Sequence, residues 1–346
     1  MIAGAGAVGA SIAYHLAERG ARDVVLTDRG MVAGGATGKA MGGVRQQFST
    51  EAEVRLAQAS VRLFKQLGPP LFEQVGYLFL ATTDRGLAEL QERAQLQREL
   101  GVPVEQTDPS AVGGLRSDDV VGAVICREDG VADPAGVTRE LVRRAAERGV
   151  EVREQTDALS LEAGTLVIAC GAGSPEAAGA RGVELPIRPL VRQLVDAGPV
   201  RGLPAELPMT IESETGFHFR RAGACLRLAM VEPAPRWGER EEVDQGLVAD
   251  WLDRLAHRYP PAAGAAVQRA WAGLYDMTPD AHPIIGSVAD GVYVACGFSG
   301  HGFMQAPAAG AAVAAELFGE EPEIDLAPYR LERFAAGANL PETVVL

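Results

Sequence analysis

Apolar and polar positions at the start of the chain alternate in a way that predicts a βαβ unit. A short apolar strand leads into a glycine turn, a helix follows from about Ala10 to Arg19, and a second strand runs from Asp23 to Asp28. A loop of small residues, Gly34 to Gly43, then leads to an amphipathic helix after Ser49-Thr50, because these hydroxyl residues precede an acidic first turn. The chain therefore opens as an α/β protein.

Later patterns predict a second lobe that interrupts the first. A strand-like run at Gly76 to Ala81 and a charged helix near Arg85 to Leu100 begin the second lobe, and the segment from Leu190 to about Tyr275 is mostly strand-like. A helix at Pro134 to Arg148 and a last strand at Val292 to Cys296 return to the first lobe. We expect the first lobe to comprise residues 1–76, 131–188 and 278–346, and the second, built on a sheet, to comprise residues 77–130 and 189–277.

The composition is that of a globular protein without a membrane span. Hydrophobic residues make up 47% and charged residues 23%, and no uninterrupted apolar run approaches the roughly 20 residues that a bilayer requires. The formal net charge of −14, with no Lys/Arg-rich block, disfavours nucleic acid as a partner. The first residues lack the basic segment and the cleavage site of a signal peptide, so we expect a cytoplasmic protein.

The four cysteines do not indicate a metal site. Cys126, Cys170, Cys225 and Cys296 form no C-x-x-C pair, and no histidine lies at metal-ligand spacing from them. We therefore expect no bound metal.

The first glycine turn carries the spacing of a dinucleotide-binding fingerprint. Gly4, Gly6 and Gly9 fit the pattern G-x-G-x-x-G between a strand and a helix, and Asp28 closes the second strand 19 residues after Gly9. Glycine lets the backbone approach a pyrophosphate at the N-terminus of the helix, and an acidic side chain can accept hydrogen bonds from ribose hydroxyls. Only three residues precede Gly4, so the first strand is short and a native start upstream of Met1 stays open.

The fingerprint alone does not distinguish NAD from FAD, because both bind at the same turn. Two later segments rich in small residues, Leu166 to Ser174 and Gly297 to Phe303, also permit close backbone approach to a ligand. The second of these precedes a helix expected from Ala306 to Leu317. A flavin buried along its whole length needs several such segments, so the pattern favours FAD.

Six segments spread over the chain together carry a family resemblance. They are Gly4–Gly9 with Asp28, Gly42–Phe48, Asp129–Pro134, Ala169–Ser174, Trp271–Gly286 and Gly297–Phe303. Together they resemble the D-amino-acid oxidase/sarcosine oxidase (DAO) superfamily of FAD-dependent oxidoreductases, nearest to the branch of sarcosine oxidase and proline dehydrogenase β subunits. The resemblance implies an FAD-binding Rossmann-like domain of the p-hydroxybenzoate-hydroxylase type, formed by the first lobe, and an interleaved substrate domain, formed by the second.

The resemblance also implies the chemistry. Family members oxidise a C–N bond by hydride transfer to the flavin N5 atom, which gives an imine that hydrolyses. We therefore expect a substrate among small amino acids or N-alkyl amino acids of the sarcosine, glycine or proline kind. Gly273 stands where monomeric sarcosine oxidases tether the flavin through a cysteine, so FAD is expected to be non-covalent. A homo-oligomer and an electron-accepting partner subunit are both compatible with this family.

Two positions depart from the family in the expected substrate site. Met304 and Tyr275 stand where relatives have a lysine and an arginine that hold the substrate carboxylate. Arg45 is then the cation predicted to bind that carboxylate, because an unpaired charge in a dry pocket is too costly. Arg227 stands where sarcosine oxidases have a lysine that promotes oxygen reduction, although an exposed strand face would also explain it. His301 and Tyr275 could contact the ligand or serve structural roles.

The expected site residues therefore fall into two groups. Those expected to act on the substrate are Arg45, Tyr275, His301 and Arg227. Those expected to bind FAD are Gly4, Gly6, Ala7, Val8, Gly9, Asp28, Arg29, Gly43, Gly171, Gly173, Gly300, His301, Gly302, Phe303 and Met304.

Two other functions remain open at this stage. A non-catalytic FAD-binding assembly or scaffold protein of the same branch would explain the missing carboxylate anchors. An NAD-linked dehydrogenase on a related two-lobe fold would share the glycine fingerprint. A bound flavin would exclude the NAD-linked enzyme, and bleaching of that flavin by an amino acid would exclude the scaffold.

Overall fold

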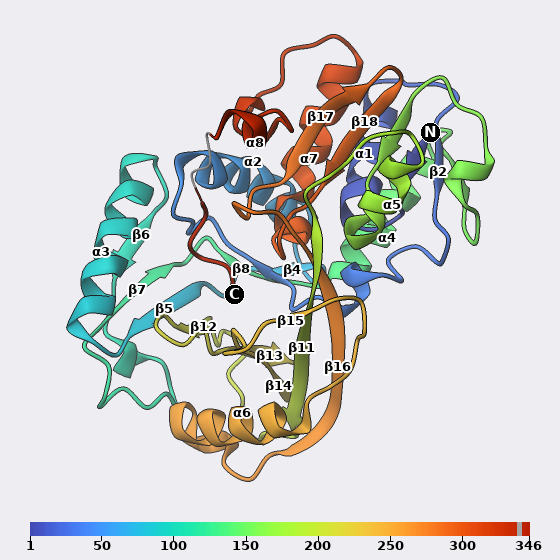
Figure 1. Ribbon diagram of the computed structural model, residues 1–346. Helices are drawn as coiled ribbons and strands as arrows, with labels where there is room; N and C mark the ends of the chain where they lie inside the picture. The colour runs from blue at the N-terminus through green and yellow to red at the C-terminus, as the bar shows by residue number, and fades with distance from the viewer. Residues whose placement is uncertain (338–340) are drawn as a thin grey trace.

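The computed structural model describes residues 1–337 and 341–346. It has two lobes, each built on its own β-sheet, and a small third sheet between them (Figure 1). The strands of the two large sheets alternate along the chain, so each lobe is discontinuous in sequence. Within the described residues, no helix is both long enough and apolar enough to cross a membrane.

The first lobe contains a six-stranded sheet with a parallel centre. Its order is β17-β18-β10-β1-β2-β9, and only β17 runs antiparallel to its neighbour. The short strand β1 lies at the centre, where Ile2 pairs with Val167 on one side and with Leu26 on the other. The strands of this sheet are β1 (Ile2–Ala3), β2 (Val25–Thr27), β9 (Glu151–Arg153), β10 (Leu166–Ile168), β17 (Ile284–Ala289) and β18 (Val292–Cys296).

Helices with small residues pack closely in this lobe. The helices are α1 (Ala7–Glu18), α2 (Glu51–Leu67), α4 (Pro134–Ala146), α5 (Ser174–Gly179), α7 (Gly302–Leu317) and α8 (Arg333–Ala336). α1 packs against both α4 and α7, and α2 also packs on α7. A Cβ at Gly310 of α7 would clash with Ser11 of α1, so glycine lets these two helices approach each other.

α1 and α7 begin earlier than the sequence pattern predicts, at Ala7 and Gly302. Glycine in the first turn of α7, followed by Pro307, lowers helix propensity and makes this start difficult to predict. The ring of Phe303 nevertheless packs against that of Phe64 of α2, with centroids 5.2 Å apart. Tertiary packing therefore extends α7 into the glycine-rich segment and brings its N-terminus close to the lobe interface.

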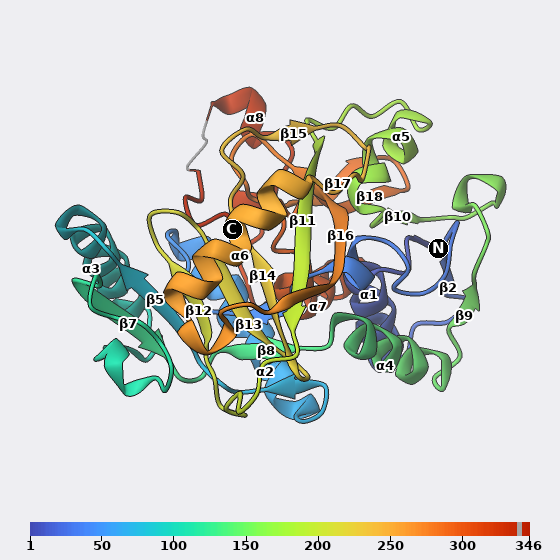
Figure 2. The same cartoon turned by 90° about the horizontal axis from the view of Figure 1, so that it is seen from below.

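The second lobe contains a nine-stranded sheet in which β11 and β16 are the longest strands. Its order is β15-β11-β14-β13-β12-β5-β7-β6, and β16 pairs with β11. β11 and β16 run side by side and antiparallel (Figure 2), and α6 packs on the sheet through Val248, Trp251 and Leu255. The elements of this lobe are β5 (Tyr77–Ala81), α3 (Asp84–Glu99), β6 (Val104–Gln106), β7 (Gly122–Cys126), β11 (Arg188–Gly198), β12 (Met209–Glu212), β13 (His218–Ala222), β14 (Cys225–Ala229), β15 (Arg236–Trp237), α6 (Gln245–Arg258) and β16 (Ala266–Met277).

The third sheet lies where the predicted lobes meet. Its strands, in the order β3-β8-β4, are β3 (Gly43–Val44), β8 (Gly130–Ala132) and β4 (Phe72–Glu73). β8 crosses the boundary expected between residues 130 and 131, and β11 begins one residue before the boundary expected at 189. Short 3-10 helices complete the described elements: η1 (Ala36–Lys39), η2 (Pro109–Ala111), η3 (Ala158–Ser160), η4 (Gly171–Gly173), η5 (Pro260–Ala262) and η6 (Ala327–Tyr329).

Candidate active site

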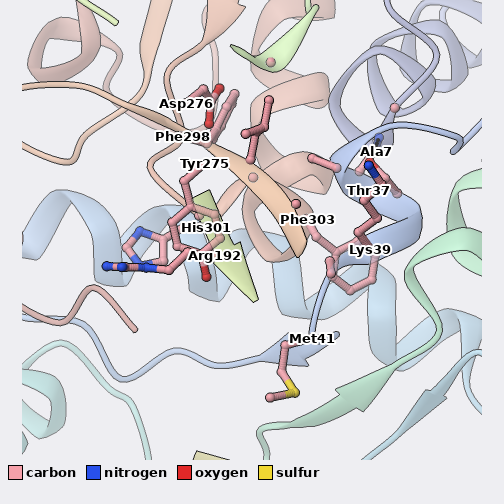
Figure 3. Close-up of a pocket in the computed structure, with 18 of the residues that line it drawn as sticks. Ala7, Thr37, Lys39, Met41, Arg192, Tyr275, Asp276, Phe298, His301 and Phe303 are labelled. Carbon is pink, nitrogen blue, oxygen red and sulfur yellow. Dashed lines mark hydrogen bonds between the residues drawn. The ribbon is translucent and has the colours of Figure 1, made fainter. Parts of the chain in front are cut away.

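A cavity of about 430 Å³ runs between the two lobes. Segments from both lobes form its walls. They are the glycine turn after β1, the segment around η1, η4, β11, β16, the start of α7 and the end of the chain. Figure 3 shows Ala7, Thr37 and Lys39 towards one end of this cavity, and Arg192 and His301 towards the other. We call these the dinucleotide end and the cationic end.

The three fingerprint glycines have different roles at the dinucleotide end. Gly4 has a φ of +101°, and a Cβ there would clash with the carbonyl of Ala169 in the neighbouring strand connection. A Cβ at Gly9 would clash with the carbonyl of Gly4, so Gly9 lets α1 pack on the turn. A Cβ at Gly6 would meet only Thr37 Oγ1, at 3.1 Å. Gly6 lines the cavity and Gly9 does not.

Asp28 fixes this turn and also lines the cavity. Its Oδ2 accepts a hydrogen bond from Ala5 N at 2.7 Å, and its Oδ1 accepts one from Gly30 N at 2.7 Å. A carboxylate has further acceptor capacity, which ribose hydroxyls can use. The predicted neighbour Arg29 instead lies outside the cavity lining, where it is exposed and pairs with Asp157 and Glu176.

The residues at the dinucleotide end fit a pyrophosphate. The N-cap of α1 is Gly6, which has no side chain, and Thr37 Oγ1 accepts from the first helical amide, Ala7 N, at 3.0 Å. The next amides of the helix N-terminus can meet an anion. Gly171 and Gly173 lie in the lining, and a Cβ at Gly171 would meet nothing within 4 Å. Ala7 and Val8 complete the wall at the start of α1.

The glycine-rich segment before α7 shapes the middle of the cavity. Gly300 has a φ of +93°, and a Cβ there would clash with the ring of Tyr275. Glycine at this position therefore lets the Tyr275 ring lie against the chain. Gly302, Phe303 and Met304, which are the first residues of α7, also line the cavity.

Arg45 is buried at the cationic end, and main-chain carbonyls bind its guanidinium. Only 1% of its surface is exposed. Nη1 donates to the carbonyl of Gln47, Nη2 donates to Val344 O at 2.6 Å, and the guanidinium lies 4.0 Å from the centre of the Phe48 ring. Arg45 lines the cavity as expected for a ligand-binding residue, but two of its three nitrogens already have partners.

His301 lies beside Arg45 as a neutral imidazole. Its Nε2 is 3.4 Å from Arg45 Nη2 and 3.2 Å from Val344 O. Burial and the adjacent Arg45 charge lower the pKa of His301 well below its usual value, so the ring carries one proton. That proton on Nε2 can donate to Val344 O, because Nδ1 has no partner among residues 1–337 and 341–346.

The end of the chain closes the cationic end, a feature that the sequence analysis did not foresee. Tyr275 Oη donates to Leu346 O at 2.8 Å, and Leu346 lines the cavity. Glu342 holds this segment in place by accepting hydrogen bonds from Ser49 N at 3.0 Å and Ser49 Oγ at 2.7 Å. The C-terminus lies between the two lobes (Figure 1).

Arg227, the fourth residue expected to act on the substrate, lies away from this cavity. Its Nε donates to Asp196 Oδ1 at 2.8 Å, and its guanidinium lies 4.8 Å from the centre of the Trp271 ring. It is not part of the cavity lining, so the structure does not bring Arg227 together with Arg45, Tyr275 and His301.

Sequence reasoning missed several residues that line the cavity. Arg192 of β11 and Asp276 of β16 are two of them, with Thr37, Tyr77 and His218. Asp276 Oδ2 accepts a hydrogen bond from Gly297 N at 2.7 Å, and burial raises the pKa of Asp276 to about 6. A signal for Arg192 was present, because Arg192 and Gln193 are polar residues that interrupt the apolar run Leu190–Val195 of β11.

No group of three or more His, Cys, Asp or Glu side chains among the described residues is arranged to hold a metal ion.

The fold and this cavity define a two-lobed dinucleotide-binding protein. The chain belongs to the DAO family, described as FAD dependent oxidoreductase, whose family model matches residues 1–316. FAD is therefore the cofactor, which the glycine fingerprint alone left open. The family predicted from the six sequence segments is confirmed.

The chain is similar over its full length to proteins of this family. It is 28% identical to FAD-dependent oxidoreductase domain-containing protein 1 from Bos taurus, with 100% of the chain and 86% of that protein covered. It is 26% identical to sarcosine oxidase subunit beta from Arthrobacter sp, with 99% and 92% covered. It is 24% identical to 4-methylaminobutanoate oxidase (formaldehyde-forming) from Paenarthrobacter nicotinovorans, of which it spans only 46%.

Two solved structures are also similar to the chain over nearly its whole length. The L-proline dehydrogenase from P. horikoshii matches with a TM-score of 0.89 and 27% identity, covering 97% of each chain. The glycine oxidase from Geobacillus kaustophilus matches with a TM-score of 0.85 and 25% identity, covering 96% of this chain and 97% of that one.

We predict that acid precipitation will release all of the FAD into the supernatant. Gly273 has no side chain to form a tether, and a Cβ there would lie 3.2 Å from Lys39 Cβ. Among the described cysteines, only Cys170 lines the cavity, and it lies at the dinucleotide end, where its Sγ donates to Ala3 O at 3.3 Å. Flavin absorbance that stays in the protein pellet would contradict this prediction.

Proposed function

We propose that the protein oxidises the C–N bond of a small amino acid or N-alkyl amino acid, of the sarcosine, glycine or proline kind. The observation that carries this proposal is one continuous cavity with a pyrophosphate-compatible end and a cationic end. The names of similar proteins support it, because they include a sarcosine oxidase subunit, a glycine oxidase and an L-proline dehydrogenase.

The proposed reaction requires a hydride acceptor, which FAD supplies when it is bound. A C–H bond on the carbon beside the substrate nitrogen breaks, and its hydrogen leaves with two electrons. The nitrogen lone pair then forms the C=N bond of an imine. Water adds to the imine and releases a carbonyl compound and an amine, and either oxygen or a partner protein accepts the electrons in the next half-reaction.

The protein's own residues would bind and orient the two ligands. Gly6 and the N-terminus of α1 would hold the pyrophosphate, and Asp28 would accept hydrogen bonds from a ribose. At the other end Arg45 would contribute the positive charge that attracts a substrate carboxylate. Tyr275 and His301 would form the polar part of the substrate site, and the two packed lobes would exclude water from it.

An anaerobic substrate screen tests this proposal. Purified protein should show flavin absorbance, and sarcosine, glycine, proline or a related amino acid should bleach it in the absence of oxygen. The carbonyl product should form in the same reaction. A flavin that no small amino acid or N-alkyl amino acid bleaches would contradict the proposal.

The non-catalytic alternative is not favoured. A regulatory protein, the pyruvate dehydrogenase phosphatase regulatory subunit from Mus musculus, is 32% identical to the chain but over only 46% of it. Proteins named as oxidases or dehydrogenases match over 96% of the chain or more. The name of the sarcosine oxidase subunit supports assembly with a partner subunit, and light scattering on the native complex would test this and homo-oligomers together.

A further inference from the structure

The cationic end contains a second guanidinium that the family resemblance did not indicate. Arg192 lies on β11 directly opposite Gly273 of β16. Side chains of directly paired residues lie on the same face of a sheet, so glycine at this position leaves space for the long arginine side chain. Tyr275 lies two residues further along β16 on that face, with its ring centre 5.8 Å from the Arg192 guanidinium. Both residues line the cavity (Figure 3).

Arg192 is half-buried, and two of its guanidinium nitrogens have no hydrogen-bond partner among the described residues. Its Nε and Nη1 atoms are buried, yet neither contacts an acceptor within residues 1–337 and 341–346. Burying hydrogen-bond donors without acceptors is unfavourable, also where the rest of the side chain is partly exposed. A ligand that supplies acceptor atoms would therefore be stabilised at this position.

The other two cations of the cavity lining are already engaged. Lys39 pairs with Glu241. Arg45 donates through both Nη atoms to main-chain carbonyls, and only its Nε lacks a partner. Arg192 is therefore the cation in the described lining with the most unused donor capacity.

None of the side-chain carboxylates in the described lining forms an ion pair with Arg192. Asp28 accepts from two main-chain amides, Asp276 accepts from Gly297 N, and Glu241 pairs with Lys39. A ligand can therefore supply the acceptor atoms that the described residues do not give Arg192 Nε and Nη1. The second lobe also contributes apolar side chains to the cavity lining, which suits a small substrate with an apolar part: Leu194, Met209, Ala229 and Met230.

We propose that Arg192 binds the carboxylate of the substrate through its planar guanidinium. This inference rests on the proposed function for the identity of the ligand. Arg45 contributes a fixed positive charge to the same end of the cavity, and Arg192 contributes the free hydrogen-bond donors. The site therefore selects amino acids over amines that lack a carboxylate.

Binding of acetate to the oxidised, FAD-loaded protein tests this assignment without any turnover. Acetate should perturb the flavin absorption spectrum or release heat in a titration, and acetamide, its neutral analogue, should not. Arg192→Gln should weaken acetate binding at least about tenfold, because a charge-assisted bidentate contact is lost. Arg192→Lys should recover only part of the affinity, since lysine cannot form two parallel bonds to one carboxylate.

Arg188→Gln is the matched control for these variants. Arg188 lies on the same strand, is exposed and stacks on the Trp237 ring at 4.5 Å, so its loss should leave acetate affinity within about twofold. Flavin content of each variant shows whether it has folded. If Arg192→Gln does not retain flavin, the acetate affinity of Arg192→Lys is compared with that of the wild type, and this comparison decides whether Arg192 binds the carboxylate.

Three outcomes would overturn the assignment. Acetate affinity could remain unchanged in both Arg192 variants, it could fall in Arg45→Met but not in Arg192→Gln, or acetamide could bind as well as acetate. These results leave the proposed function standing if an amino acid still bleaches the flavin. Conversely, acetate binding that depends on Arg192, in a protein that no amino acid reduces, would support the carboxylate site and contradict the proposed function.

Discussion

A Gly6→Val protein is expected to fold and to purify without FAD. A Cβ at Gly6 meets only Thr37 Oγ1 within the protein, at 3.1 Å, so the valine side chain would project into the cavity at the dinucleotide end. The pyrophosphate must approach the backbone closely at this turn, and the added methyl groups would occupy that space. Flavin absorbance per mole of protein should fall close to zero.

Gly9→Val is the informative comparison for this prediction. A Cβ at Gly9 would clash with the carbonyl of Gly4, so that variant should be destabilised in its fold rather than only in its cofactor site. Circular dichroism and thermal unfolding separate the two cases. A well-folded Gly6→Val protein with the flavin content of the wild type would mean that the turn does not face the cofactor.

Arg45→Met is expected to keep its flavin and to lose most of its turnover. Arg45 was predicted from sequence to bind the substrate carboxylate. Its part in substrate binding stays a prediction. Arg45 can offer the substrate its positive charge and one free donor, Nε. Losing such a charge-assisted contact costs about 1.5 to 3 kcal/mol, so kcat/KM should fall by a factor between about ten and more than a hundred. Arg45→Lys should recover only part of this loss.

Steady-state kinetics on the best substrate of the screen measures this effect. If kcat/KM of Arg45→Met stays within about threefold of the wild type, Arg45 has no part in substrate recognition. The Arg192 variants then become decisive for how a carboxylate binds. Because Arg45 Nη2 also holds Val344 O, unfolding temperature should be recorded to separate loss of fold from loss of recognition.

The dinucleotide end could be predicted from sequence because its chemistry depends on local spacing. Gly4, Gly6 and Gly9 lie in one turn, and Asp28 follows after one helix and one strand, so a few short-range rules place all four. Even there, spacing did not separate the glycines by role. Gly9 serves packing and Gly6 faces the cavity, which only the positions of surrounding atoms reveal.

The cationic end was harder to predict, because it assembles residues that are far apart in sequence. Arg45, Arg192 and Leu346 meet there from a loop, a strand and the end of the chain. Arg227 illustrates the opposite error. The resemblance placed Arg227 among the residues expected to act on the substrate, yet its side chain pairs with Asp196, outside the cavity lining.

The most direct test of the account is a single anaerobic turnover with the best amino-acid substrate. One equivalent of substrate should bleach one equivalent of flavin, and acid quenching should then release one equivalent of the carbonyl product predicted for C–N oxidation. Bleaching without that carbonyl product, or no bleaching by any small amino acid or N-alkyl amino acid, would contradict the account.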